Sequence, residues 1–399
     1  MTTTAARMRA WTGPALLTYG FRPFFLGASL WAAGAMMLWI LMLSGAVELP
    51  TRFDPVTWHA HEFLFGYLGA VVAGFLLTAV PNWTGRLPVV GWPLACLCLL
   101  WLIGRGAVAV SMHLPVWLVA LADLSLSLAL IGFLTREIVR DRNWRNLIVL
   151  GMLIAFTLAN GIFHWQAAAG GFAGGELGLR LGLAAGIMMI AVIGGRIVPS
   201  FTRNWLVKRG EKSLPAPPMQ RFDRVALLVL LAALLLWVVV PQQAVSGLAL
   251  IAAGLVHAIR LVRWRGARTL AEPLLWVLHA GYGFLPLGAV ILGIATIWPD
   301  LLGQAPAQHV WMAGAIGLMT LAVMTRATLG HTGRVLMAGK GTLAIYICLI
   351  AAVLARLLTG FLPAASGALY MISGLCWIAA FGGFAILYGP LLLRAPAKS

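Results

Sequence analysis

Apolar residues occur along this 399-residue chain in long blocks, and that pattern limits the fold more than any other feature of the sequence. Each block is about 20 residues long, the length that an α-helix needs to cross roughly 30 Å of hydrocarbon. Only 10% of the residues are charged and 61% are hydrophobic, whereas a soluble domain has about 25% charged residues. The sequence therefore predicts an all-α, polytopic membrane protein that contacts the lipid bilayer.

Twelve blocks have this length. The predicted spans are residues 23–46, 56–80, 91–111, 115–136, 143–169, 177–200, 222–240, 243–262, 272–297, 306–327, 341–361 and 365–390. The connection with the most charge and proline, residues 203–221, separates six spans from six. We therefore expect one integral membrane domain over residues 1–399, with halves 14–205 and 220–392 joined by a cytoplasmic linker.

The positive charge of the chain follows the order of its loops. Of the 28 Lys and Arg residues, 24 lie in the termini and the even-numbered loops, and only Arg52 and Arg180 lie in odd-numbered loops. Because loops rich in Lys and Arg stay on the cytoplasmic side, both termini are predicted to be cytoplasmic. The net charge of +17 thus reflects topology, and no nucleic-acid partner is expected.

An internal duplication relates the first and second spans to the ninth and tenth. With His61 set over His309, seven identities fall within 26 positions at a constant offset of 248. The repeated residues include Gly66 with Gly314, Gly69 with Gly317, Ala79 with Ala327, and 84–86 with 332–334. The preceding spans share YGFRP at 19–23 and YGFLP at 282–286, and PSFTRNW at 199–205 makes the sixth span a weaker third copy. Spans 2, 6 and 10 would suit a threefold pseudo-symmetric bundle of twelve helices.

The paired glycines form a narrow strip of small residues on spans 2 and 10. In a membrane such a strip lets a neighbouring backbone or a flat ring approach closely. The alternative is that these glycines only pack helices together.

Four histidines lie in the outer part of the predicted bundle. His59, His61 and His309 enter spans 2 and 10 from the outside, and His164 lies about 8 Å inside the outer end of span 5. Imidazole is a common ligand for copper, zinc and haem iron, so His61, His309 and His164 are the best metal-ligand candidates. His59 can join His61 on one metal only if the start of the helix is irregular.

A second group of histidines lies toward the cytoplasmic face. His279 and His331 occur in glycine-rich contexts, HAGYGFLP and LGHTGR, and either a ligand or proton role or a hydrogen-bonded structural role suits them. His257, with Arg260 and Arg263 in the next turn, is expected to be an interfacial side chain.

Few other polar residues lie within the spans. Arg105 and Asp123 fall at similar depth on neighbouring helices, so a mutual salt bridge is expected because burial of a lone charge is costly. Arg356 could face an anionic group such as a haem propionate, as could Arg105, or it could snorkel outward. Glu62 could relay protons or orient a ligating histidine.

Motifs of soluble enzymes are missing, since the chain has no P-loop, no CxxC and no HExxH. Transporters often have helices broken by Gly or Pro at corresponding places in two halves. YGFRP and YGFLP meet that description, so a transporter or channel for a metal ion or small anion, with a histidine-lined pathway, is the alternative function.

Several motifs resemble the NnrS family of bacterial membrane proteins, and the likeness extends over nearly all twelve spans. The motifs are FRPFF at 21–25, WHAHE at 58–62, AGFLLTAVPNWTGR at 73–86, RNWRN at 142–146 and MTRATLGHTGR at 324–334. Members of this family are described as haem- and copper-containing inner-membrane proteins of nitric oxide metabolism and nitrosative-stress resistance. The resemblance implies metal ligation by His59, His61, His164, His279, His309 and His331, and it marks Arg22, Arg86, Arg326 and Arg334 as motif arginines.

The twelve helices and the spacing of four also resemble the catalytic subunit of haem–copper oxidases. Span 6 lacks a histidine, so that ligand set does not transfer directly. The resemblance assigns no reaction to the chain. An oxidoreductase that uses nitric oxide and a sensor without turnover are both compatible with it.

The resulting hypothesis is a bacterial inner-membrane protein that binds b-type haem and copper. Two of His61, His309 and His164 would be axial ligands of haem iron. Nitric oxide would bind at the iron or at a nearby copper, an electron donor would supply electrons, and protons would pass through Glu62. Besides Glu62, the residues expected to contact cofactors are Arg22, Arg105 and Arg356.

Overall fold

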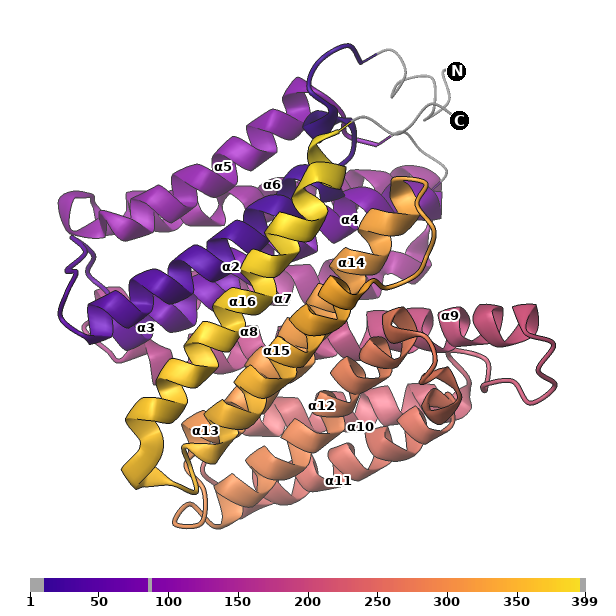
Figure 1. Ribbon diagram of the computed structural model, residues 1–399. Coiled ribbons are helices and arrows are strands. Elements are labelled where there is room, and N and C mark those ends of the chain that lie inside the picture. The colour runs from indigo at the N-terminus through magenta and orange to yellow at the C-terminus, as the bar shows by residue number, and fades with distance from the viewer. Residues whose placement is uncertain (1–10, 85–87, 395–399) are drawn as a thin grey trace. The chain divides into compact units, whose positions relative to one another are not determined.

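A computed structural model describes residues 11–84 and 88–394, and the regular structure within them is entirely helical (Figure 1). It contains twelve helices that are long and apolar enough to cross a membrane. They are Phe21–Leu43, Pro55–Pro81, Trp92–Ala109, Val116–Arg140, Trp144–Ala168, Leu177–Lys208, Arg221–Val239, Ala244–Val262, Pro273–Ile297, Gln304–His331, Lys340–Leu358 and Pro363–Leu393. The predicted all-α fold with twelve spans is therefore confirmed, and the chain is a multi-pass membrane protein. The motif residue Arg86 lies outside the described residues.

The chain forms two compact units. Unit 1 comprises Met1–Gly182, Thr328–Arg334 and Phe384–Ser399, and unit 2 comprises Leu183–Ala327 and Val335–Gly383. The cytoplasmic location of the termini and the division into halves at 203–221 remain predictions.

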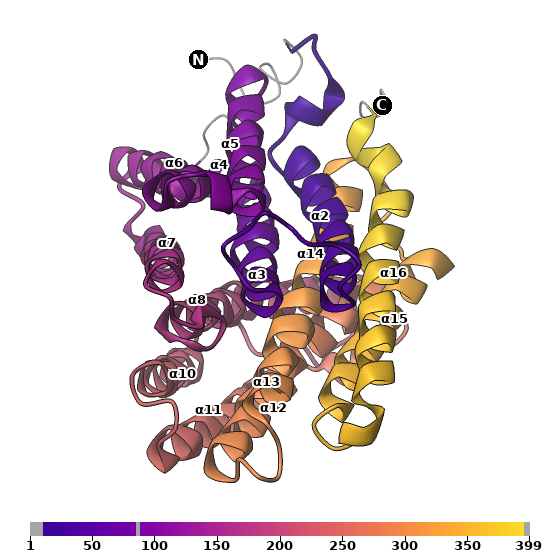
Figure 2. The same cartoon turned by 90° about the vertical axis from the view of Figure 1, so that its left-hand side faces the viewer.

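Unit 1 contains the first five spans. Its helices are η1 (Ala15–Thr18), α2 (Phe21–Leu43), α3 (Pro55–His61), η2 (Glu62–Tyr67), α4 (Leu68–Thr84), α5 (Trp92–Ala109), η3 (Ser111–His113), α6 (Val116–Asp141), η4 (Trp144–Asn146), α7 (Leu147–Ala168) and η5 (Ala173–Gly175). Helix α2 packs on α4, α5 packs on α6, and α6 packs on both α4 and α7 (Figure 2). Spans 2 to 5 thus surround a common interior within this unit.

Most of unit 2 is formed by spans 6 to 12. Its helices are η6 (Ile190–Gly194), α9 (Gly195–Lys208), α10 (Arg221–Val239), α11 (Ala244–Val262), η7 (Gly266–Thr269), α12 (Pro273–Ile297), α13 (Gln304–His309), η8 (Val310–Leu318), α15 (Lys340–Leu358) and η9 (Pro363–Ala365). Three helices cross a unit boundary, namely α8 (Leu177–Met189), α14 (Met319–His331) and α16 (Ser366–Leu393). Within unit 2, α12 packs against both α11 and η8.

Spans 2, 6 and 10 share an irregularity that the other spans lack among the described residues. Each contains a π-helical segment, namely η2, η6 and η8 respectively. In spans 2 and 10 the π-helix begins directly after His61 and His309. The common irregularity agrees with the predicted kinship of the three spans, and π-helical turns occur often at functional sites.

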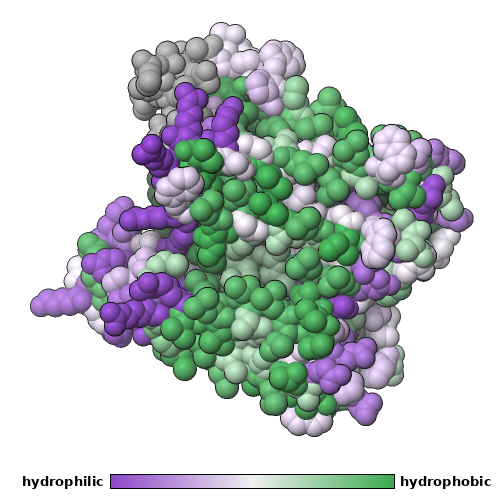
Figure 3. All heavy atoms as spheres, turned by 180° about the vertical axis from the view of Figure 1, so that it is seen from behind, coloured by the Kyte–Doolittle hydropathy of each residue, from purple (hydrophilic) through white to green (hydrophobic). Residues whose placement is uncertain are grey.

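The outside of the chain is suited to lipid. The face seen in Figure 3 is broadly hydrophobic, with hydrophilic side chains toward its margins. Trp117, Val262 and Ile386 are among the large apolar side chains that are mostly exposed, at 68%, 77% and 77%. Surfaces of this kind are not stable in water over so large an area, whereas the bilayer accepts them.

Close backbone contact between α7 and α8 depends on a glycine in unit 1. A Cβ atom at Gly178 would lie 2.6 Å from the backbone nitrogen of Phe163. We predict that Gly178→Val lowers the free energy of unfolding by about 1–3 kcal/mol, the usual cost of overpacking, as measured by denaturation in detergent. The control is Gly151→Val on α7, where an added Cβ meets nothing within 4 Å. Equal stability of the two variants would contradict the close contact.

Candidate metal centre

The centre begins where the second span enters unit 1. The carboxylate of Asp54 accepts hydrogen bonds from the backbone N–H groups of Val56 and Thr57 and so caps α3. Helix α3 ends at His61, and Glu62 opens the π-helix η2. Both side chains are fully buried. The cap and the helix change together place two consecutive polar residues in an apolar interior.

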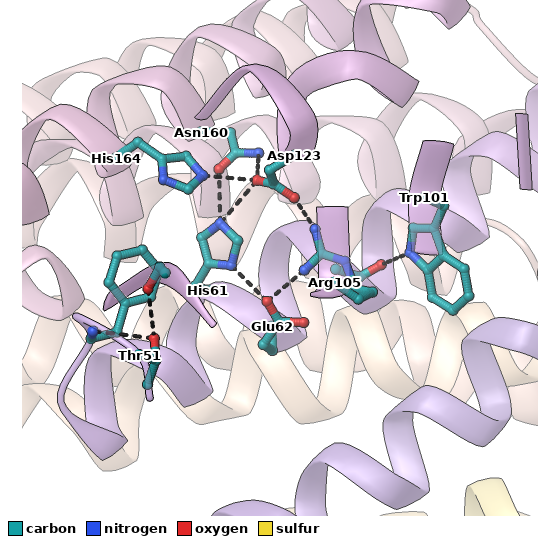
Figure 4. A network of polar contacts seen from close by, with 11 residues as sticks. Thr51, His61, Glu62, Trp101, Arg105, Asp123, Asn160 and His164 are labelled. Carbon is teal, nitrogen blue, oxygen red and sulfur yellow. Dashed lines mark hydrogen bonds and ion pairs between the residues drawn. The ribbon is translucent and has the colours of Figure 1, made fainter. Parts of the chain in front are cut away.

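Helices α6 and α7 bring further polar groups to His61. Asp123 lies on α6, while Asn160 and His164 lie four residues apart on α7 and therefore share one face. The Nε2 atoms of His61 and His164 lie 3.1 and 2.9 Å from the same oxygen, Oδ2 of Asp123 (Figure 4). The amide of Asn160 donates to that oxygen at 2.7 Å, and its own oxygen lies 3.1 Å from His61 Nε2.

The ligand atoms of His61, Asp123 and His164 all lie within 4.8 Å of one another. Within residues 11–84 and 88–394, this is the only set of three or more His, Cys, Asp or Glu side chains that converges in this way. All three side chains are buried.

Arg105 on α5 joins both carboxylates of the cluster. Its guanidinium donates to Glu62 Oε1 at 2.5 Å and also to Asp123 Oδ1. The predicted salt bridge between Arg105 and Asp123 is therefore confirmed. Glu62 Oε1 in turn lies 3.0 Å from Nδ1 of His61, so a closed ring of contacts links spans 2, 3 and 4.

The charges of this ring do not balance when the histidines are neutral. Glu62 and Asp123 carry two negative charges, and Arg105 carries one positive charge. An unbalanced charge is costly in a buried site. The surplus is one negative charge. A proton that makes His61 an imidazolium, or a monovalent cation such as Cu⁺ on the two Nε2 atoms and the Asp123 oxygen, would restore the balance.

Glycines allow this close assembly. A Cβ atom at Gly66 would lie 2.6 Å from Nη1 of Arg105, and one at Gly104 would lie 3.0 Å from the Cα atom of Asp123. The carbonyl of Gly66 also accepts a hydrogen bond from the indole of Trp101 at 3.0 Å. The strip predicted on span 2 thus admits a flat guanidinium at Gly66.

The related glycines of span 10 admit flat rings instead. Added Cβ atoms at Gly314 and Gly317 would lie 2.6 Å from the ring of Phe284 and 3.0 Å from the ring of Trp377. Close approach of rings, one of the predicted uses of the strip, is therefore present in unit 2.

Aromatic side chains enclose the two histidines. The rings of Phe53, Phe65 and Phe163 lie 5.4, 5.5 and 5.3 Å from the ring of His61, and Phe53 lies 5.8 Å from His164. An enclosure of this kind excludes water and strengthens the electrostatic interactions inside it.

Two imidazole nitrogens and one carboxylate oxygen form a donor set that suits copper, zinc, iron or nickel better than magnesium or calcium. The convergence of both Nε2 atoms on one oxygen fits a single ion. It does not fit a haem between the two histidines, because their ring centres are only 5.0 Å apart and both Nε2 atoms lie within 3.1 Å of one Asp123 oxygen.

The other predicted histidine ligands lie outside this cluster. His59 stacks on Trp39 at 4.1 Å between ring centres and packs on Phe63 at 4.5 Å. The α3 helix is regular through both histidines, so His59 and His61 point in different directions.

The remaining three predicted ligands are divided between the units. His309 in unit 2 donates from Nδ1 to the carbonyl of Ala305 at 2.7 Å. His279, also in unit 2, lies 2.8 Å from the hydroxyl of Thr202. His331 belongs to unit 1, where its ring stacks on Tyr19 at 5.5 Å.

The predicted cofactor-binding arginines other than Arg105 contact the chain itself. Arg22 donates to three carbonyls at the end of α16, those of Leu391, Leu392 and Arg394. Arg356 donates to the hydroxyl of Thr359 at 2.8 Å and lies over the ring of Tyr370 at 4.7 Å. The motif residue Arg326 lies 4.3 Å from the ring centre of Phe201.

The prediction of His257 as an interfacial side chain is wrong. His257 is fully buried and bonds Tyr282 and the carbonyl of Ala226. The nearby Arg260 is also fully buried, because it pairs with Asp223 at 2.7 Å. Local arginines resembled a membrane interface, but the carboxylate that draws Arg260 inward lies on another helix.

Sequence reasoning missed two members of the metal centre. Asp123 was expected only as the partner of Arg105, and Asn160 was not singled out. The available signal was the spacing of Asn160 and His164 on one helix face, together with Asp123 as the carboxylate within the predicted span 115–136.

Comparison with known families supplies one match. The family model described as NnrS protein matches residues 15–395, which is nearly the whole chain. No curated protein matches the chain.

The ring of buried charges predicts a specific effect on stability. We expect Arg105→Met to lower the free energy of unfolding by about 3–5 kcal/mol, because it leaves two buried carboxylates without their cation. Thermal or denaturant unfolding in detergent measures this effect. Adding Glu62→Gln should restore part of the loss. The control is Arg356→Met, which should cost less than about 1 kcal/mol because its partners Thr359 and Tyr370 carry no charge. Similar losses in both variants would disprove the role of Arg105.

Proposed function

The chain belongs to the NnrS family, and from this premise we propose that it is a copper-binding protein of the bacterial inner membrane that acts in nitric oxide metabolism or nitrosative-stress resistance. The observation that carries the metal assignment is the convergence of His61 and His164 on Asp123 Oδ2. The link to nitric oxide comes from the family. The geometry supports a metal at His61, Asp123 and His164.

Copper fits this place for three reasons. Its preferred ligands include imidazole nitrogen, the three donors are buried and lie close together, and a cation offsets the surplus negative charge of Glu62 and Asp123. Bound copper would supply one-electron redox chemistry. His61, His164 and Asp123 would be its ligands.

The surrounding residues hold these ligands in place. Glu62 accepts from Nδ1 of His61, which fixes the imidazole ring and leaves Nε2 to face Asp123. Partners of this kind commonly orient metal ligands and raise their basicity. Arg105 and Asn160 fix the Asp123 carboxylate from two sides. A proton could move between Glu62 Oε1 and His61 Nδ1, which are 3.0 Å apart.

Haem does not belong at this cluster, because the packed side chains have no space for a porphyrin. The b-type haem implied by the family is therefore proposed outside it, and no step of the function is assigned to it. Of the three predicted axial ligands of haem iron, only His309 lies outside this cluster, and His279 and His331 remain predicted metal ligands without an assigned metal.

The transporter alternative depended on broken helices at two related motifs. Helix α12 runs without interruption from Pro273 to Ile297 and includes the whole YGFLP motif. The YGFRP motif lies at the start of α2 rather than in the middle of a span. Neither motif breaks a helix, so this observation no longer favours transport over a metal-dependent function.

Metal analysis of the purified protein tests the assignment. We expect bound copper in the wild type and a loss of at least tenfold in copper affinity for His61→Ala, His164→Ala and Asp123→Asn, because each removes one ligand. Membranes that contain any of these three variants should also lose the reductant-dependent removal of nitric oxide. The control is His59→Ala, which removes a histidine two residues from His61 and should retain both properties.

Other results of these measurements would contradict the proposed function. A wild-type protein that binds no copper would disprove the proposal, as would retention of copper by all three ligand variants. Copper binding without any effect of the variants on nitric oxide would disprove the proposed role but not the metal site.

A further inference from the structure

A small cavity lies in unit 1 against one side of the metal centre. Its volume is about 30 Å³, and side chains from spans 2, 3, 4 and 5 line it. Arg105, Asp123 and Asn160 form its polar end. The rest of the lining is mainly apolar and includes Phe65, Leu126, Leu130, Leu153 and Phe156.

The size of the cavity restricts what can enter it. About 10–15 Å³ of such volume accommodates one water molecule, so the cavity holds one or two molecules of that size. Organic substrates are therefore too large, whereas diatomic molecules fit.

The lining offers few unpaired hydrogen-bond donors to a water molecule. The hydroxyls of Ser127 and Thr157 already donate to the carbonyls of Leu124 and Leu153. Within the described part of the chain, Arg105 Nε is one lining donor that lacks a partner. A buried water needs two to four polar partners, but an uncharged gas molecule needs none and can still accept one weak hydrogen bond.

Gly69 lines the cavity and has open space beside it. An added Cβ atom there meets nothing within 4 Å, whereas Gly66, one turn earlier, contacts the Arg105 guanidinium closely. Gly69 and Val72 on α4 and Ser127 on α6 line the cavity and are each partly exposed. The cavity therefore approaches the outer surface between α4 and α6, which pack against each other.

We propose that this cavity is a binding pocket for a small uncharged diatomic gas that enters from the bilayer between α4 and α6. Gases of this kind dissolve better in hydrocarbon than in water. An entrance that opens to the bilayer therefore admits them from the phase in which their concentration is higher. A gas molecule in the pocket would lie beside Asp123, which lines the pocket and is a proposed copper ligand. The identification of the gas as nitric oxide rests on the proposed function, but the pocket itself does not.

Xenon tests the pocket without any chemistry, because it is an apolar atom that binds in small apolar cavities. We expect xenon to bind wild-type protein, as detected by xenon-129 nuclear magnetic resonance. Gly69→Leu should abolish this binding because the added side chain occupies the cavity, and Gly69→Ala should weaken it. The control is Gly106→Leu on α5, an exposed glycine that also has nothing within 4 Å of an added Cβ atom and does not line the cavity.

The same variants test the connection to nitric oxide. Gly69→Leu should keep its bound copper and raise the KM for nitric oxide at least tenfold, whereas Gly106→Leu should match the wild type. Xenon should compete with nitric oxide in the wild type and not in Gly69→Leu.

These experiments distinguish a failure of the proposed pocket from a failure of the proposed function. Wild-type protein that binds copper but no xenon, or a Gly69→Leu variant with unchanged xenon binding and KM, overturns the pocket. Wild-type protein that binds xenon but neither copper nor nitric oxide overturns the proposed function and leaves the pocket standing. Gly69→Ala and the wild-type xenon measurement retain this distinction even if Gly69→Leu does not fold.

Discussion

The interior of unit 1 depends on the contacts that the carboxylate of Asp123 makes with side chains of three other spans. One oxygen meets the nitrogens of His61, His164 and Asn160, and the other meets Arg105. Four spans thus converge on a single acidic residue in a setting where an unpaired charge is costly. Backbone geometry makes this possible, because the lack of a side chain at Gly66 and Gly104 lets η2, α5 and α6 approach closely enough for contact.

The spans were predictable from the sequence because each one must satisfy its own backbone in lipid, which makes hydropathy a local signal. The convergence of side chains was not local. His61, Glu62 and the Arg105–Asp123 pair were identified from depth and from the cost of buried charge. The role of Asp123 as a common partner of two histidines depends on how α6 and α7 pack, which hydropathy does not encode. His257 shows the reverse error, since its local context was misleading and its partners are distant in sequence.

The two copies of the repeat share their helix geometry but differ in the polar side chains around the histidine. A π-helix follows His61 in one copy and His309 in the other. At the same offset of 248, however, Glu62 corresponds to Val310. The second copy thus lacks the carboxylate that faces Nδ1 of the histidine in the first copy, so equivalent histidines have different surroundings. Arg105 and Asp123 lie in spans 3 and 4, outside the repeated spans, so repeat detection could not show that they join the first copy's histidine.

The charge balance explains why the centre and its neighbouring cavity form one arrangement. Both ring nitrogens of His61 lie within hydrogen-bond distance of a carboxylate oxygen, and a metal at Nε2 requires that this nitrogen carries no proton. Glu62 and Asp123 supply the carboxylate oxygens in contact with the ring, so they are the nearest acceptors for a proton that a metal displaces. Asp123 also lines the cavity, whose other lining residues are mainly apolar. An uncharged gas in the cavity would therefore lie beside the same carboxylate that holds the two histidines together.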